Sequence, residues 1–147
     1  MFNLGRKAFL EKNAEKLVVE AIGKAESKTQ AEIRVHLAHK VKKDVYTEAV
    51  ATFRRLGLYK TEWRNAILIY VVPKEQKFAI VGDIGIHEKV KDIFWQQVRD
   101  AMTAAFAAGE LADGIVKGIE LAGEKLAEYF PLNGANPNEL SDEISRS

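Results

Sequence analysis

The sequence of 147 residues contains no cysteine. This absence excludes disulfide bonds, iron–sulfur ligation and cysteine-rich zinc sites. It also excludes every enzyme that attacks its substrate with a thiolate, the cysteine-dependent phosphatases among them. Any catalysis must therefore rely on carboxylates, hydroxyls, imidazoles, arginines or a metal ion.

Long apolar segments are missing as well. The longest apolar run, residues 66–73, has the length of one strand and is far shorter than the roughly 20 residues that cross a bilayer. After the basic pair Arg6-Lys7, charged residues from Glu11 onward interrupt the apolar stretch that a signal peptide requires. We therefore expect a soluble, cytoplasmic protein without membrane insertion.

The chain has little excess charge, because 22 Lys and Arg face 21 Asp and Glu for a net charge of +1. A balanced chain has no broad attraction for polyanions, so we expect no nucleic-acid partner. The basic residues Lys40, Lys42, Lys43, Arg54 and Arg55 are typical of a solvated surface, the alternative being a patch for an anionic partner. The sequence leaves a protein partner and the oligomeric state open.

The spacing of apolar residues predicts four helices and three strands. Apolar residues repeat every three to four positions in a helix and alternate in a half-buried strand. The predicted helices span residues 6–27, 45–56, 87–107 and 110–130, and the predicted strands span residues 33–37, 66–72 and 78–81. Residues 1–132 are predicted to form one domain, followed by a polar, acidic tail over 133–147.

The order of these elements predicts an α/β fold. A helix connects the first two strands, which makes them parallel, whereas the short turn at 73–76 makes the third strand antiparallel to the second. We expect a three-layer α/β/α sandwich, with a small mixed sheet of three or four strands flanked by about four helices.

This topology brings polar residues together, because the first two strands begin at the end of the sheet where the third strand finishes. The residues at this end are Glu32, Thr61, Arg64, Asn65, Gly82, Asp83 and Gly85. Their carboxylate, amide, hydroxyl and loop carbonyl oxygens are the hard ligands that Ca²⁺ and Mg²⁺ prefer, and the glycines permit a sharp loop whose carbonyls turn inward. The alternative is structural: Asp83 closes an Asx-turn, Asn65 caps a strand, and Glu32 pairs with Arg34 or Arg64.

Several motifs resemble the TPM domain. They are Ala31-Glu32-Ile33-Arg34-Val35, Arg64-Asn65 and Gly82-Asp83-Ile84-Gly85, within a likeness that covers most of residues 6–143. The resemblance implies an α/β/α domain that binds a divalent metal, chiefly calcium, at the sheet end. Mapped onto this chain, the metal ligands are Glu32, Asn65 and Asp83, with Thr61, Gly82 and Gly85 in support. We expect Ca²⁺, with Mg²⁺ as the alternative.

The resemblance also implies acid phosphatase activity, as ascribed to thylakoid-lumen relatives. An aspartyl-phosphate mechanism usually needs a second carboxylate two residues after the nucleophile, and after Asp83 that position is Gly85. The remaining mechanism is metal-assisted attack of water on a phosphomonoester. The catalytic candidates are Asp83, Arg34 and Arg64, and the two arginines would bind the phosphate. The three histidines share no zinc-binding spacing, and we expect His36 to be a hydrogen-bonded core or near-surface residue.

Overall fold

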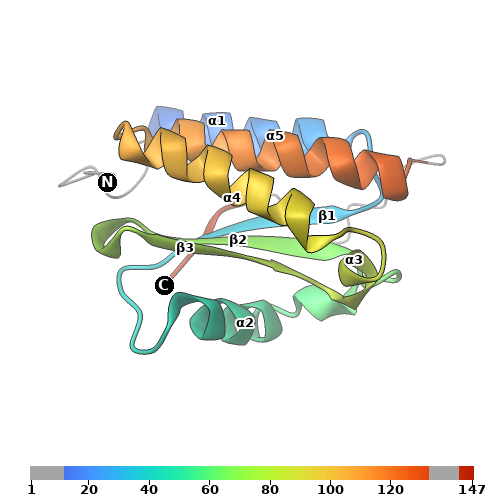
Figure 1. Cartoon of the computed structure of the whole chain (residues 1–147), viewed down its shortest axis with the longest axis horizontal. Helices are drawn as coiled ribbons and strands as arrows, with labels where there is room; N and C mark the ends of the chain where they lie inside the picture. The colour runs from blue at the N-terminus through green and yellow to red at the C-terminus, as the bar shows by residue number, and fades with distance from the viewer. Residues whose placement is uncertain (1–11, 133–142) are drawn as a thin grey trace.

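The computed structural model describes residues 12–132 and 143–147 as a mixed sheet between two layers of helices (Figure 1). Three long helices cover one face of the sheet and α2 covers the other, which confirms the predicted three-layer sandwich. The helices are α1 (Lys12–Glu26), α2 (Val45–Arg55), α3 (Ile84–His87), α4 (Asp92–Ala107) and α5 (Leu111–Tyr129). The strands are β1 (Glu32–Leu37), β2 (Ala66–Val72), β3 (Lys77–Gly82) and β4 (Ser145–Arg146).

The sheet has the strand order β3-β2-β1-β4. Strands β1 and β2 are parallel with Val35 opposite Ile69, and β3 runs antiparallel to β2, both as predicted. The short strand β4 adds to the free edge of β1, with Ser145 opposite His36. A strand of this length has no detectable hydropathy period, so the pattern of the predicted tail does not reveal it; residues 133–142 of that tail lie outside the described residues.

One helix boundary differs from the sequence prediction, and another lies outside the described residues. The predicted helix over 87–107 begins only at Asp92, as α4, because Lys91 adopts an extended conformation immediately before it, and the short α3 (Ile84–His87) precedes this start. Residues 6–11 of the first predicted helix lie outside the described residues. Helix α4 ends near Gly109, as expected, and Gly109 takes the positive φ of 80° that glycine tolerates best.

The alternation of side chains along the strands divides the core into two clusters. Ile33, Val35 and Leu37 of β1 face α1, α4 and α5, together with the odd-numbered residues of β2. The even-numbered residues of β2 pack with Phe53 of α2 and with Leu58. All seven residues of β2 are buried, as an apolar run covered on both faces requires.

Candidate functional site

The strand register places two acidic residues on the same face of the sheet, on either side of a small residue. Glu32 of β1 pairs with Ala66 at the start of β2. From the other side, the backbone N–H of Asp83 donates to the carbonyl of Ala66 at 3.0 Å, extending the β3 register by one residue. Opposed residues project from the same face, so Glu32, Ala66 and Asp83 form one row on the face that α2 partly covers. Glu32 is fully buried and Asp83 is 6% exposed.

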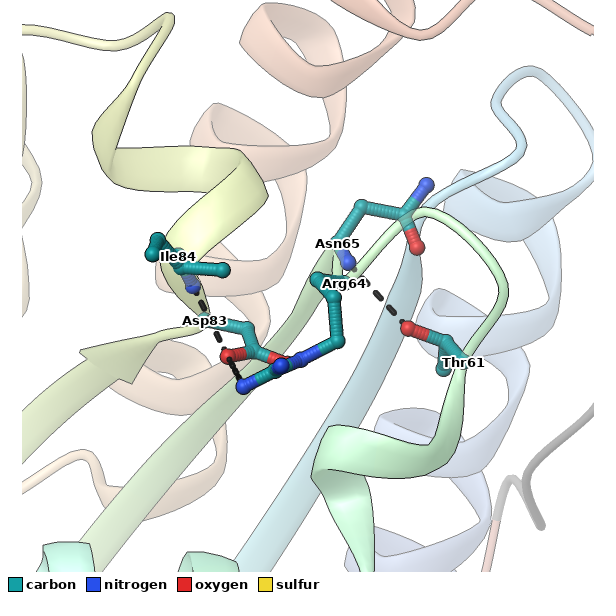
Figure 2. A network of polar contacts seen from close by, with 5 residues as sticks. All are labelled: Thr61, Arg64, Asn65, Asp83 and Ile84. Carbon is teal, nitrogen blue, oxygen red and sulfur yellow. Dashed lines mark hydrogen bonds and ion pairs between the residues drawn. The ribbon is translucent and has the colours of Figure 1, made fainter.

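The carboxylate of Asp83 is held by Arg64 (Figure 2). Arg64 Nε lies 2.7 Å from Asp83 Oδ2, and Arg64 Nη2 lies 2.8 Å from Oδ1. The same Oδ1 accepts a hydrogen bond from the backbone N–H of Ile84 at 2.8 Å, which caps α3. The hydrogen bonds to Asp83 raise the pKa of the Arg64 guanidinium. Arg64 is therefore the ionic partner of Asp83, whereas the structural alternative paired Arg64 with Glu32, and Asp83 caps α3 in place of closing an Asx-turn.

The loops at 61–65 and 82–86 pack directly against each other. The N–H of Gly85 donates to the carbonyl of Arg64 at 2.9 Å. A Cβ added at Gly85 would lie 2.3 Å from the carbonyl oxygen of Trp63 and 2.6 Å from that of Arg64. The described glycines with positive φ are Gly57 and Gly109, so Gly82 and Gly85 do not supply the backbone freedom that we expected of them. Gly85 is needed because there is no room for a side chain.

Asn65 and Thr61 lie apart from the acidic row. The Asn65 side chain points away from the Asp83 carboxylate (Figure 2), and its Nδ2 donates to the carbonyl of Gln30 at 3.3 Å. The hydroxyl of Thr61 accepts a hydrogen bond from the Asn65 N–H at 3.2 Å. Among the described residues, Asn65 Oδ1 is buried without a hydrogen-bond partner. Of the predicted ligands, the structure brings Glu32 and Asp83 into one row and directs the Asn65 amide elsewhere.

Arg34 is half-buried and lies two residues along β1 from Glu32, on the same face. The register pairs Arg34 with Leu68, one row further into the sheet than Asp83. Of the two candidate phosphate-binding arginines, Arg64 is therefore the one that contacts Asp83.

The donor set limits which metals would suit this site. Across residues 12–132 and 143–147 there is no group of three or more His, Cys, Asp or Glu that could hold a metal ion. A cation at the acidic row would have two carboxylates, nearby backbone oxygens and water as ligands. Oxygen-only coordination completed by water fits Ca²⁺ or Mg²⁺ and does not fit a zinc site.

A groove that the sequence did not reveal borders Asp83. We call it the Tyr46 groove; its volume is about 520 Å³. Its lining residues are Tyr46, Val50, Phe53, Arg54, Tyr59, Arg64, Val81, Gly82 and Asp83. The groove forms where α2 meets β3 and the loop before β2, and no single segment of the sequence contains enough of it to signal a site.

His36 lies on the same face of β1, at the far end from Glu32. It is 1% exposed, its ring stacks on Tyr70, and its nitrogens lie 2.7 Å from Ser145 Oγ and 2.8 Å from Ser147 Oγ. Burial, and next the positive charges of Arg55 and Arg34, lower the pKa of His36 to about 4. His36 is therefore a neutral, hydrogen-bonded residue that holds β4 against the sheet, as its predicted role requires.

Within the described part of the chain, no helix is both long and apolar enough to cross a membrane.

Both the sequence and the fold of this chain are similar to those of known proteins. The model of a protein family, the TPM domain, matches residues 6–125. No curated protein matches the sequence. Among solved structures, the BA42 protein of the psychrophilic bacterium Bizionia argentinensis, determined by NMR, is 40% identical, with a TM-score of 0.92 over 97% of this chain and 99% of its own.

Two more distant structures share the fold alone. The N-terminal domain of the cg2496 protein from Corynebacterium glutamicum is 14% identical, with a TM-score of 0.65 over 95% of this chain and 82% of its own. The N-terminal domain of a protein from P. gingivalis is 18% identical, with a TM-score of 0.65 over 88% of this chain and 85% of its own.

Proposed function

We propose that this chain, which belongs to the TPM domain family, is a divalent-cation-binding module for Ca²⁺ or Mg²⁺. The observation that supports this function is the row of Glu32, Ala66 and Asp83, in which two buried carboxylates lie on one face at the end of the sheet. Ala66 separates them with a single methyl group, so β2 places no long side chain between the two carboxylates.

The charge and chemistry of the row favour a divalent cation. Two carboxylates supply up to four oxygens, and Ca²⁺ completes its six to eight ligands with carbonyl oxygens and water. In this proposal Glu32 and Asp83 are the anionic ligands. Thr61, Gly82 and Gly85 fix the shape of the two loops, and Asn65 is the predicted third ligand, which reaches the row only if its amide turns.

A cation titration followed by amide chemical shifts tests this proposal. Adding CaCl₂ or MgCl₂ should shift resonances in residues 32, 61–66 and 82–86, and calorimetry should give the affinity. Asp83→Asn and Glu32→Gln should each weaken binding by at least roughly tenfold, since each removes a formal charge and an oxygen ligand. Asp92→Asn is the matched control, because Asp92 is 90% exposed on α4.

Two results would contradict the proposed site. Wild-type protein that shows no shifts with either cation would have no such site. Equal cation affinity in the wild type and in Asp83→Asn would place the bound cation elsewhere.

A second candidate function is a metal-assisted acid phosphatase that acts on phosphomonoesters at the same site. The observation that favours it is the Tyr46 groove, which places Arg54 and Arg64 beside Asp83. Arg64 can bind a phosphate through two parallel hydrogen bonds, and Arg34 is the further candidate from the sequence. A bound cation would supply polarisation of the phosphoryl oxygens.

Activity measurements separate the two functions. An enzyme should hydrolyse a phosphomonoester in a chelator-sensitive reaction that Asp83→Ala abolishes. A binding module should show the cation-induced shifts without turnover. A protein partner is compatible with the module and would be found at the surface around the site.

A further inference from the structure

We propose that the Arg64–Asp83 ion pair is an exchangeable gate that couples the divalent cation to an anionic ligand in the Tyr46 groove. The ligand is a small organic anion, a carboxylate or a phosphate with an apolar, ring-bearing body. This inference rests on the proposed cation site and adds to it a second ligand and a mechanism of coupling.

The gate follows from the hydrogen bonds that the Asp83 carboxylate already accepts. Both carboxylate oxygens already accept hydrogen bonds from Arg64, at 2.7 and 2.8 Å. A cation that binds Asp83 must displace at least one of these bonds, and it then repels the guanidinium because both are positively charged. The Ile84 N–H, at 2.8 Å from Oδ1, keeps the carboxylate in place while Arg64 leaves.

Arg64 is placed to move. Its side chain is 50% exposed, whereas that of Asp83 is 6% exposed, so water can receive the guanidinium but not the carboxylate. The Arg64 backbone has a φ of 51°, a conformation that non-glycine residues seldom adopt. Packing with Gly85 maintains this conformation, and the guanidinium at the tip remains the movable part.

The Tyr46 groove is the place where the released Arg64 guanidinium would bind an anion. Arg64 and Asp83 both line it, together with Arg54. With the pair closed, Asp83 offsets Arg64 and only the charge of Arg54 remains uncompensated among the lining residues. With a cation on Asp83, both Arg54 and Arg64 are available to an anion in the groove. Their two positive charges select an anionic ligand.

The walls of the groove favour an apolar, ring-bearing ligand. Val50, Phe53 and Val81 supply apolar surface. Tyr46 and Tyr59 are 50% and 43% exposed, so their rings are available for stacking. The volume of about 520 Å³ is in the range of small-molecule pockets.

Linkage makes the coupling reciprocal. If the cation frees Arg64 for the anion, the anion must strengthen cation binding by the same factor. Couplings of this kind usually amount to roughly 5- to 150-fold in affinity.

Calorimetry with CaCl₂ and phenylphosphonate, which resists hydrolysis, tests the gate. Ca²⁺ affinity of the wild type should rise roughly tenfold when phenylphosphonate is present, and phenylphosphonate affinity should rise equally with Ca²⁺. Methylphosphonate should bind more weakly, since it lacks the ring. The Arg64 Nε–H resonance should shift when Ca²⁺ is added alone.

Two variants isolate the role of Arg64. Arg64→Gln should bind Ca²⁺ more tightly than the wild type without any anion, because Asp83 is no longer covered, and should lose the coupling. Arg54→Gln is the matched control, since it lines the groove without touching Asp83: it should weaken phenylphosphonate binding and leave Ca²⁺ affinity unchanged. Circular dichroism should confirm that both variants are folded.

The outcomes distinguish the gate from the cation site. Equal Ca²⁺ affinity in the wild type and Arg64→Gln, with an unmoved Nε–H resonance, overturns the gate and leaves the proposed function intact. Coupling that persists in Arg64→Gln also overturns it, because the anion would then contact the cation directly. Absence of Ca²⁺ binding in both proteins overturns the cation site itself.

Discussion

The two faces of the sheet differ in both cover and chemistry. On one face, Ile33, Val35 and Leu37 of β1 are packed beneath α1, α4 and α5. On the other face the same strand presents Glu32, Arg34 and His36, while α2 packs mainly over β3 and less over β2. The helix-covered apolar face holds the larger core cluster, whereas the α2 face combines a smaller apolar cluster with ionisable groups.

Two buried polar groups on that face, Asp83 and His36, have hydrogen-bond partners at its two ends. Burying an ionised group is costly unless it is paired or hydrogen-bonded. Asp83 is paired with Arg64 at one end of the face, and His36 is neutral and bonded to Ser145 and Ser147 at the other. The difference teaches that β1 places its ionisable side chains on one face of the sheet and the larger apolar cluster on the other, a separation that substitutions can test.

The largest expected effect is on the apolar face. Ile69→Ala removes a fully buried side chain from the centre of the sheet and leaves a cavity. We expect the free energy of unfolding to fall by about 2–5 kcal/mol, measured by urea denaturation. Ile93→Ala is the control: Ile93 is 72% exposed, and the change should stay within about 0.5 kcal/mol.

If the free energy of unfolding fell no more in Ile69→Ala than in the control, the apolar face would not be the main source of stability. The variant should also retain the cation-binding shifts around residue 83, because Ile69 faces away from the acidic row. Loss of those shifts in a folded variant would show that the two faces are not independent.

An intermediate effect is expected at Gly85, where the loops of the site meet. Gly85→Ala places a methyl group 2.3 Å from the Trp63 carbonyl oxygen, so the backbone must shift. We expect destabilisation of about 1–3 kcal/mol together with weaker cation binding, measured by denaturation and calorimetry. Ile84→Ala, at a neighbouring residue that is 54% exposed, should change stability little. A fully stable Gly85→Ala with unchanged affinity would show that the close contact is unimportant.

The smallest effect concerns His36 and depends on pH. Because the folded pKa is lowered to about 4 from 6.5, the unfolded chain takes up a proton first, and stability falls as pH falls from 6.5 towards 4. Between pH 7 and pH 5 we expect a loss of about 1–2 kcal/mol, with an allowance for solvent screening at the sheet edge. His36→Gln should lack this loss, so the difference between the two denaturation profiles isolates the histidine. Parallel profiles would show that His36 is not held neutral in the folded protein.

The sequence was most informative where a residue's role depends on its own segment. The all-apolar run of β2 predicted a strand buried on both faces, and the connection lengths predicted which strands are parallel. It was less informative about contacts between segments. That Arg64 rather than Arg34 pairs with Asp83 depends on loop packing, and the course of β4 beside β1 depends on a pairing of only a few residues.

The sequence by itself determined the fold class and the end of the sheet where the polar residues gather. Apolar periodicity and connection length are local properties, and they determine the directions of the first three strands. Only the tertiary structure decided that Glu32 and Asp83 share a row across Ala66, that Asn65 turns away, and that a groove opens beside Arg64. These features depend on register, side-chain direction and the packing of α2, which are set by contacts between residues far apart in the chain. The absence of cysteine excludes thiol chemistry. The polar contact that the structure shows at the candidate site is the ion pair between Arg64 and Asp83.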